Sequence, residues 1–96
     1  TILPMFDQGV ELFSFEADEI ETMAKAEHDR WLEERFIDGW TYTENHKRID
    51  TKVSPYLVPW DMLPESTKES DRTFVRKMPY LLSMAGYMII RDEMYF

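Results

Sequence analysis

The two histidines, His28 and His46, are the side chains that would most readily bind a metal or transfer a proton at neutral pH. A helical metal site would need a second histidine or a carboxylate three or four residues from His28, but apolar residues and a lysine hold those places. Glu27 precedes His28, yet neighbours on a helix point about 100° apart, so the two do not form an acid–base pair by themselves. We expect no metal site and no cofactor.

Other catalytic patterns are missing from the sequence. It has no cysteine and no G-x-S-x-G, and its three glycines are too far apart for a phosphate-binding loop or a dinucleotide fingerprint. We therefore expect that the protein is not an enzyme. The alternative enzyme hypothesis requires an acid–base site that the fold assembles around His28.

Basic residues in the second half form a stripe, with Lys68, Arg72 and Arg76 at intervals of four. One interpretation is a pocket for a phosphate or another small anion. The other is that they pair with the first half, because residues 1–44 carry twelve acids and three bases, and residues 45–96 carry seven acids and eight bases. The net charge of −8 argues against a nucleic-acid partner.

Aromatic residues are frequent, at 15% of the sequence, and they lie near these polar groups. His28 stands three residues before Trp31, which fits a structural histidine packed beside an indole. The other aromatics form the core in one interpretation and the walls of a ligand site, even a cation cage, in the other. They include Trp40, Tyr42, Tyr56 and Trp60.

These side chains must be positioned by a mainly helical fold. The period of apolar residues predicts a helix over residues 16–36, stopped by Gly39. It also predicts a short helix over residues 64–70 and a further helix that is capped by Asp71 and ends before Gly86, with a kink or restart at Pro79. We expect a small single domain of three to four helices with short extended or β segments.

The remaining segments are extended pieces and loops. We expect short extended pieces at residues 40–42 and 87–90, and in residues 54–66 three prolines forbid one regular helix although apolar side chains lie between them. Residues 1–15 are interpreted as an arm or the end of a preceding domain, and residues 16–96 as the domain itself. The longest uncharged run, residues 78–90, is too short for a membrane span, and no signal peptide is apparent, so we expect a cytoplasmic protein.

An ordered set of motifs runs through these elements: A-K-x-x-H-x-x-W from Ala24, G-W-T-Y from Gly39, P-Y-L-V-P-W-x-x-L from Pro55, K-x-x-x-R from Lys68 and L-x-x-x-G-Y from Leu82. The set resembles the ryanodine receptor repeat, or RyR domain, over roughly residues 20–90. One departure is Thr43, where the family favours glycine after the G-W-x-Y motif.

The resemblance implies a small, mostly helical module that is not known as catalytic. Such repeats occur as tandem pairs in the cytosolic part of calcium-release channels and as single copies in bacterial proteins, so it implies a regulatory or interaction module. We expect it to bind a neighbouring domain, a second copy of itself, or a small ligand that is nucleotide-like or anionic. A purely structural interaction or dimerisation domain without a pocket is the alternative.

If a ligand binds, we expect the site between the first helix and residues 55–60, with aromatic walls to stack on a ring and bases to contact an anion. The candidate site residues are His28, Trp31, Trp40, Tyr42, Lys52, Trp60 and Arg72.

Overall fold

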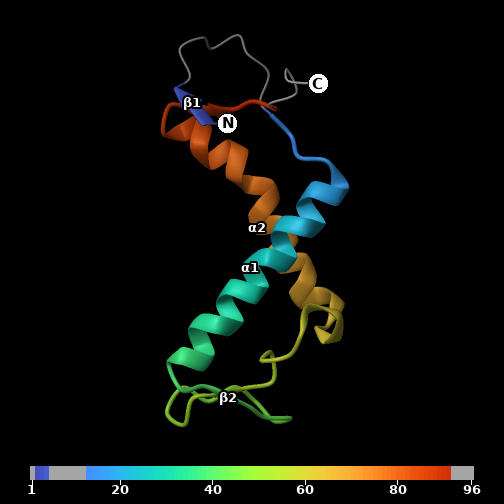
Figure 1. Ribbon diagram of the computed structural model, residues 1–96, viewed down its shortest axis with the longest axis vertical. Helices are drawn as coiled ribbons and strands as arrows, with labels where there is room; N and C mark the ends of the chain where they lie inside the picture. Colours follow the sequence, from blue (N-terminus) through green and yellow to red (C-terminus); the bar gives the residue numbers. More distant parts are fainter. Residues whose placement is uncertain (1, 5–12, 92–96) are drawn as a thin grey trace.

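Two long helices cross near their middles and give the protein an X-shaped outline in a computed structural model, which describes residues 2–4 and 13–91 (Figure 1). The helices are α1 (Ala17–Ile37) and α2 (Glu65–Met84). One end of the X carries the short strands β1 (Ile2–Pro4) and β4 (Tyr87–Ile89), and the other carries β2 (Thr41–Tyr42) and β3 (Val53–Ser54).

Helix α1 begins and ends where its sequence predicts. The backbone N–H of Glu16 donates to the Glu19 side chain at 2.8 Å, and acidic residues in the first turn favour the positive end of the helix dipole. At the other end, Gly39 has a φ of +87°, a left-handed conformation that glycine adopts without strain and that lets the chain turn away.

Helix α2 corrects the prediction of three to four helices. The two helices predicted on either side of residues 70–71 are one continuous helix, and the described residues contain two α-helices plus a 3-10 turn, η1 (Trp60–Met62). Asp71 lies inside this helix and is not its cap, and Pro79 lies within it without ending it. Pro79 is buried, so its packing offsets the hydrogen bond that the Val75 carbonyl loses.

The predicted end of α2 is confirmed. Gly86 has a φ of +86°, and the chain then enters β4, which pairs antiparallel with β1. The predicted extended piece after Gly39 is also confirmed, because β2 pairs in parallel with β3 and places Thr41 opposite Val53. These two small pairings anchor the ends of the long helices.

The core lies where the helices cross. It contains buried side chains from α1, from η1 and the residue after it, and from α2: Ile20, Ala24, Trp60, Leu63 and Val75. Residues 55–60, which we call the proline segment, run along α1 toward η1 and bury Leu57 and Trp60 while Tyr56 and Pro59 remain largely exposed. Prolines keep this segment extended, so it covers the core without regular structure.

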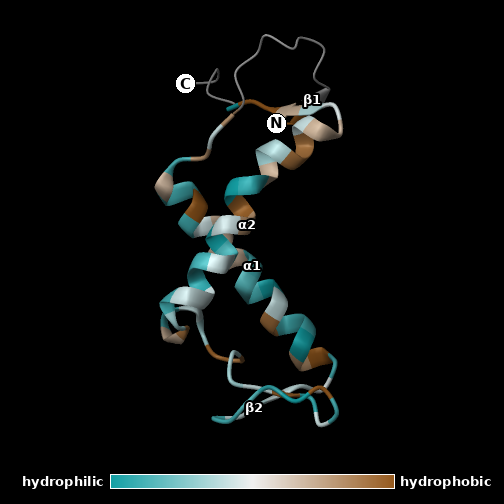
Figure 2. Cartoon of the chain, turned by 180° about the vertical axis from the view of Figure 1, so that it is seen from behind, coloured by the Kyte–Doolittle hydropathy of each residue, from teal (hydrophilic) through white to brown (hydrophobic). Residues whose placement is uncertain are grey.

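The arms of the X extend well beyond this core. The radius of gyration is 17.1 Å, whereas a compact chain of this length has about 12.5 Å. The hydropathy-coloured view shows apolar residues toward the C-terminal end of α2, beyond the crossing point (Figure 2). Across the part of the chain that the structure describes, no helix is long and apolar enough to cross a membrane.

Candidate functional site

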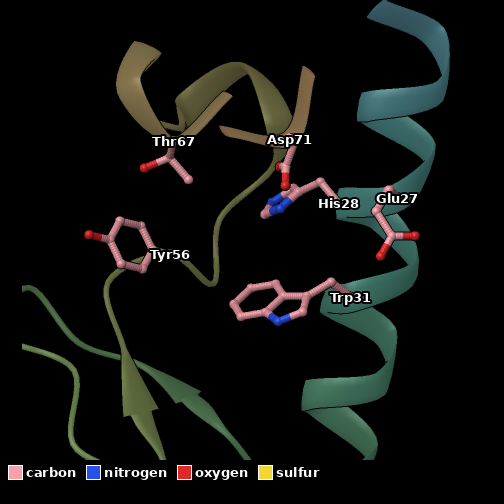
Figure 3. Close-up of a pocket in the computed structure, with 6 residues that line it drawn as sticks. All are labelled: Glu27, His28, Trp31, Tyr56, Thr67 and Asp71. Atoms are coloured by element: carbon pink, nitrogen blue, oxygen red, sulfur yellow. The ribbon is translucent and has the colours of Figure 1, made fainter. Parts of the chain in front are cut away.

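A cavity of about 160 Å³ opens below the helix crossing, between α1, the proline segment and α2 (Figure 3). The side chains of Trp31 and Tyr56 stand on opposite sides of it, and Thr67 and Asp71 lie at one end. Its six lining residues are Glu27, His28, Trp31, Tyr56, Thr67 and Asp71. Residues three or four apart share a helix face, so α1 contributes His28 and Trp31 together, and α2 contributes Thr67 and Asp71.

His28 ties α1 to the proline segment. Its side chain is only 4% exposed, and its Nε2 lies 2.7 Å from the backbone oxygen of Val58. A carbonyl can only accept a hydrogen bond, so Nε2 carries the hydrogen and Nδ1 is an acceptor in the neutral ring. The imidazole also stacks on Trp31, with 5.6 Å between ring centroids and 22° between the planes.

His28 lines the cavity, and its second ring nitrogen is Nδ1. This nitrogen has no hydrogen-bond partner in residues 2–4 and 13–91, and in this same part of the chain no side-chain nitrogen or oxygen is both fully buried and unpartnered. Nδ1 is therefore not fully buried, and His28 is one of the residues that line the cavity.

Asp71 brings a partly buried carboxylate to the same cavity. Burial raises the pKa of this carboxyl, the electrostatic interaction with His28 opposes the rise, and the negative charge of Glu27 adds to it. Within the described residues, no hydrogen bond or ion pair holds the Asp71 carboxylate. Glu27 differs, because Arg30 donates to both of its oxygens at 2.9 and 2.6 Å and thereby lowers its pKa.

A prediction for stability follows from the raised pKa of Asp71. Folding favours the protonated carboxyl, so the ionised form costs stability once the pH is above its folded pKa. Asp71→Asn should therefore raise the melting temperature at pH 7, and the difference from the wild type should vanish below the ordinary aspartate pKa of about 3.9. Thermal unfolding monitored by circular dichroism at several pH values measures this; a lower melting temperature for Asp71→Asn at pH 7 would contradict it.

A comparison with protein-family models identifies the family of this chain. The model described as RyR domain matches residues 4–91, which is most of the chain. The protein belongs to the RyR domain family. The match includes the motif positions that carry the resemblance, and it extends to a residue of β1 and through β4.

Two of the seven candidate site residues of this RyR domain, His28 and Trp31, line the cavity. Trp60 is next to them, 6.1 Å from His28 between ring centroids, but it is 4% exposed and belongs to the core. Trp40 is buried at the far end of α1 and donates from its indole nitrogen to Asp38 at 3.3 Å. Tyr42 is 52% exposed and does not line the cavity.

The two candidate anion contacts of the RyR domain lie outside the cavity and are paired with acids. Arg72 is 16% exposed, donates to Glu21 at 2.7 Å, and also pairs with Glu65 and Glu69. Its guanidinium lies 5.7 Å from the ring centroid of Trp60. Lys52 donates to the backbone oxygen of Asp38 at 3.0 Å and pairs with its carboxylate at 3.4 Å. Arg72 therefore joins the two helices, as the pairing interpretation of the basic stripe predicted.

The sequence prediction missed the α2 side of the cavity in this RyR domain. Thr67 and Asp71 stand four residues apart, a spacing that places them on one face only if the helix continues through residues 70–71. The interpretation of Asp71 as a helix cap breaks the helix there, so the sequence does not indicate that Thr67 and Asp71 share a face. Tyr56 and Glu27 were noted in the sequence but were not assigned to the site. No group of three or more potential metal ligands is present in the described ranges.

Proposed function

We propose that this RyR domain is a non-catalytic cytoplasmic module that recognises a small ligand, or a group projecting from a partner, in the cavity between α1, the proline segment and α2. The observation that carries the proposal is the accessible cavity, where the rings of Trp31 and Tyr56 stand on opposite sides and Asp71 lines one end. Ligand sites commonly combine apolar walls with a few placed polar groups. A regulatory role fits a module whose bound group bridges both helices.

The non-catalytic part of the proposal rests on His28. This histidine is held by a backbone carbonyl and is stacked on Trp31. Its only carboxylate neighbour in the cavity without a pairing partner, among the residues described, is Asp71, and the two form no hydrogen bond. A general base would need such a partner or a positioned substrate to act on. The arrangement supports recognition more than proton transfer.

Blocking the cavity tests the proposal. A thermal-shift screen with cationic, neutral and anionic compounds should find at least one class that stabilises the protein, by about 2.7 kcal/mol and roughly 10–20 °C at 100 times its Kd. Thr67→Phe fills the cavity and should abolish the shift. Ser66→Phe is the matched control, because Ser66 is exposed one residue away on the same helix and should keep the shift. A screen without stabilisation by any class would contradict the proposal.

A second candidate function, self-association, is favoured by the uncovered face of α2. Phe74, Met78 and Leu81 are 52%, 38% and 51% exposed and follow one another at intervals of four and three residues. An aromatic side chain such as Phe74 buries about 150–250 Å², so this stripe and its apolar surroundings offer several hundred Å², and a standard interface buries about 800 Å² per partner. A second copy of the chain, related by a two-fold axis, would supply the same stripe, and each stripe would cover the other.

Self-association predicts a dimer that depends on the stripe. Sedimentation equilibrium should show a concentration-dependent dimer for the wild type and a monomer for Leu81→Glu. The matched control is Tyr80→Glu, because Tyr80 is equally exposed at 55% but points about 100° away from Leu81 on the helix. A wild type that remains monomeric at high concentration, or equal loss of dimer in both variants, would contradict this second function.

A further inference from the structure

We propose that the group bound in the cavity is an organic cation with N–H donors, a guanidinium or an alkylammonium. This inference rests on the proposed function and specifies its ligand class. The first argument is the chemistry of the lining. Asp71 presents a carboxylate without a partner in the described residues, Glu27 presents one that Arg30 already pairs, and no lysine or arginine is among the six lining residues. A ligand that brings positive charge and hydrogen-bond donors is the complement of such a site.

The second argument is the unpaired polar atoms. His28 is only 4% exposed and lines the cavity, and its Nδ1 has no hydrogen-bond partner in the described part of the chain. The Asp71 carboxylate likewise has no partner there. Neither acceptor is fully buried, and a donor-bearing cation in the cavity would replace the water at both of them with hydrogen bonds, one of which is charge-assisted. One planar guanidinium carries five donors in a fixed fork and can serve a carboxylate and a second acceptor at once.

The third argument is size. The cavity measures about 160 Å³, close to the roughly 150 Å³ of a protein cavity that holds benzene, and below the roughly 300–1,000 Å³ of pockets for whole drug-sized ligands. It accommodates a charged head group, while a complete nucleotide would lie mostly outside. A bare metal ion is disfavoured because the described residues offer no cluster of three ligating side chains.

The aromatic walls distinguish among cations. Trp31 already stacks with His28, and the guanidinium of Arg35 lies 5.6 Å from its ring centroid. The ring of Tyr56 stands across the cavity without such a neighbour in the described residues (Figure 3). Guanidinium is weakly hydrated and stacks on aromatic rings, whereas a strongly hydrated small ion does not. The net charge of −8 also attracts cations to the protein and repels phosphates.

Isothermal titration calorimetry on the full chain tests this ligand class. The probes are agmatine and butylammonium as donor-bearing cations, tetramethylammonium as a cation without N–H groups, adenine as a neutral ring, and adenosine monophosphate as an anion. Agmatine and butylammonium should bind, tetramethylammonium should bind more weakly, and the nucleotide should bind least. The bound cation could be an arginine side chain of a partner protein or a free metabolite, and an acetylated Gly-Arg-Gly amide distinguishes them. If the peptide binds as tightly as agmatine, the result supports a partner's arginine. If agmatine binds and the peptide does not, the result supports a free metabolite.

Two variants complete the design. Asp71→Asn keeps the shape and should weaken agmatine by about tenfold or more, because it removes the carboxylate of a charge-assisted pair. Asp61→Asn removes the same charge from an exposed position outside the cavity lining and should change the affinity by about twofold at most. Equal affinity of wild type and Asp71→Asn overturns the cation assignment.

The outcomes separate this inference from the proposed function. Binding of adenine or adenosine monophosphate that Thr67→Phe blocks, together with no binding of either donor-bearing cation, overturns the ligand class and leaves the binding function intact. No heat of binding with any probe, combined with no stabilisation in the wider screen, overturns both.

Discussion

Trp60→Ala should lower the free energy of unfolding by about 3–5 kcal/mol, the largest effect expected from a single truncation in this domain. Trp60 is 4% exposed and packs in the core beside Ile20, Ala24 and Val75. Its removal would leave a large cavity at the point where the helices cross, and the surrounding structure can collapse only partly into it.

Polar contacts add to this loss. The Trp60 indole N–H donates to Glu21 at 3.2 Å, and Glu21 also accepts from Arg72, whose guanidinium lies over the Trp60 ring. The substitution therefore loosens the connection between α1 and α2 as well as the core. Urea unfolding followed by circular dichroism measures the change in free energy.

Trp31→Ala is the matched control for this measurement. Trp31 is the same residue type, but it lines the open cavity and is only partly buried. Its truncation should cost about 1–2 kcal/mol, because burial scales with the apolar area removed from water. Equal losses for the two variants, or a smaller loss for Trp60→Ala, would contradict the assignment of Trp60 to the core and Trp31 to the cavity wall.

His28→Ala should have the second largest effect, a loss of about 2–4 kcal/mol. The substitution removes a buried ring that stacks on Trp31, and it leaves the Val58 carbonyl without the donor now 2.7 Å away. The Val58 carbonyl is partly buried, so water replaces the lost donor only incompletely. The proline segment would then lose one of its attachments to α1, and the bond from Trp60 to Glu21 would remain.

His28→Gln separates the hydrogen bond from the volume of the ring. The amide nitrogen of glutamine can take the place of Nε2 and donate to Val58, so this variant should recover a substantial part of the stability that His28→Ala loses. Chemical denaturation of both variants, under the same buffer conditions, provides the comparison. A glutamine variant no more stable than the alanine variant would show that the bond to Val58 contributes little.

Local signals explain the parts of the fold that the sequence predicts well. Gly39 and Gly86 adopt the left-handed conformation after helix ends, and acids fill the first turn of α1. These features depend on a few neighbouring residues and on backbone geometry. The continuity of α2 is different, because Asp71 and Pro79 both carry local signals for a boundary. Packing across the helix crossing outweighs those signals, and the sequence alone does not contain that contact.

The candidate site also has a part that the sequence predicts and a part that depends on tertiary packing. The sequence predicts a cleft between α1 and the proline segment, and the cavity lined by His28 and Trp31 lies there. It does not predict Thr67 and Asp71 because their shared face depends on the continuity of α2. Lys52 and Arg72 are attractive anion contacts in the sequence, but the fold brings each of them to an acidic partner, and such distant pairings are set by the tertiary structure.

A nuclear magnetic resonance titration that follows the tryptophan indole signals is the most direct test of the central claim that the cavity is the binding site. The chain has three tryptophans. The indoles of Trp40 and Trp60 donate to Asp38 and Glu21, whereas that of Trp31 lies at the cavity. Titration with agmatine and the hits of the compound screen should shift the Trp31 signal and leave the other two nearly unchanged. Saturating ligand that shifts Trp40 or Trp60 but not Trp31 would contradict the account.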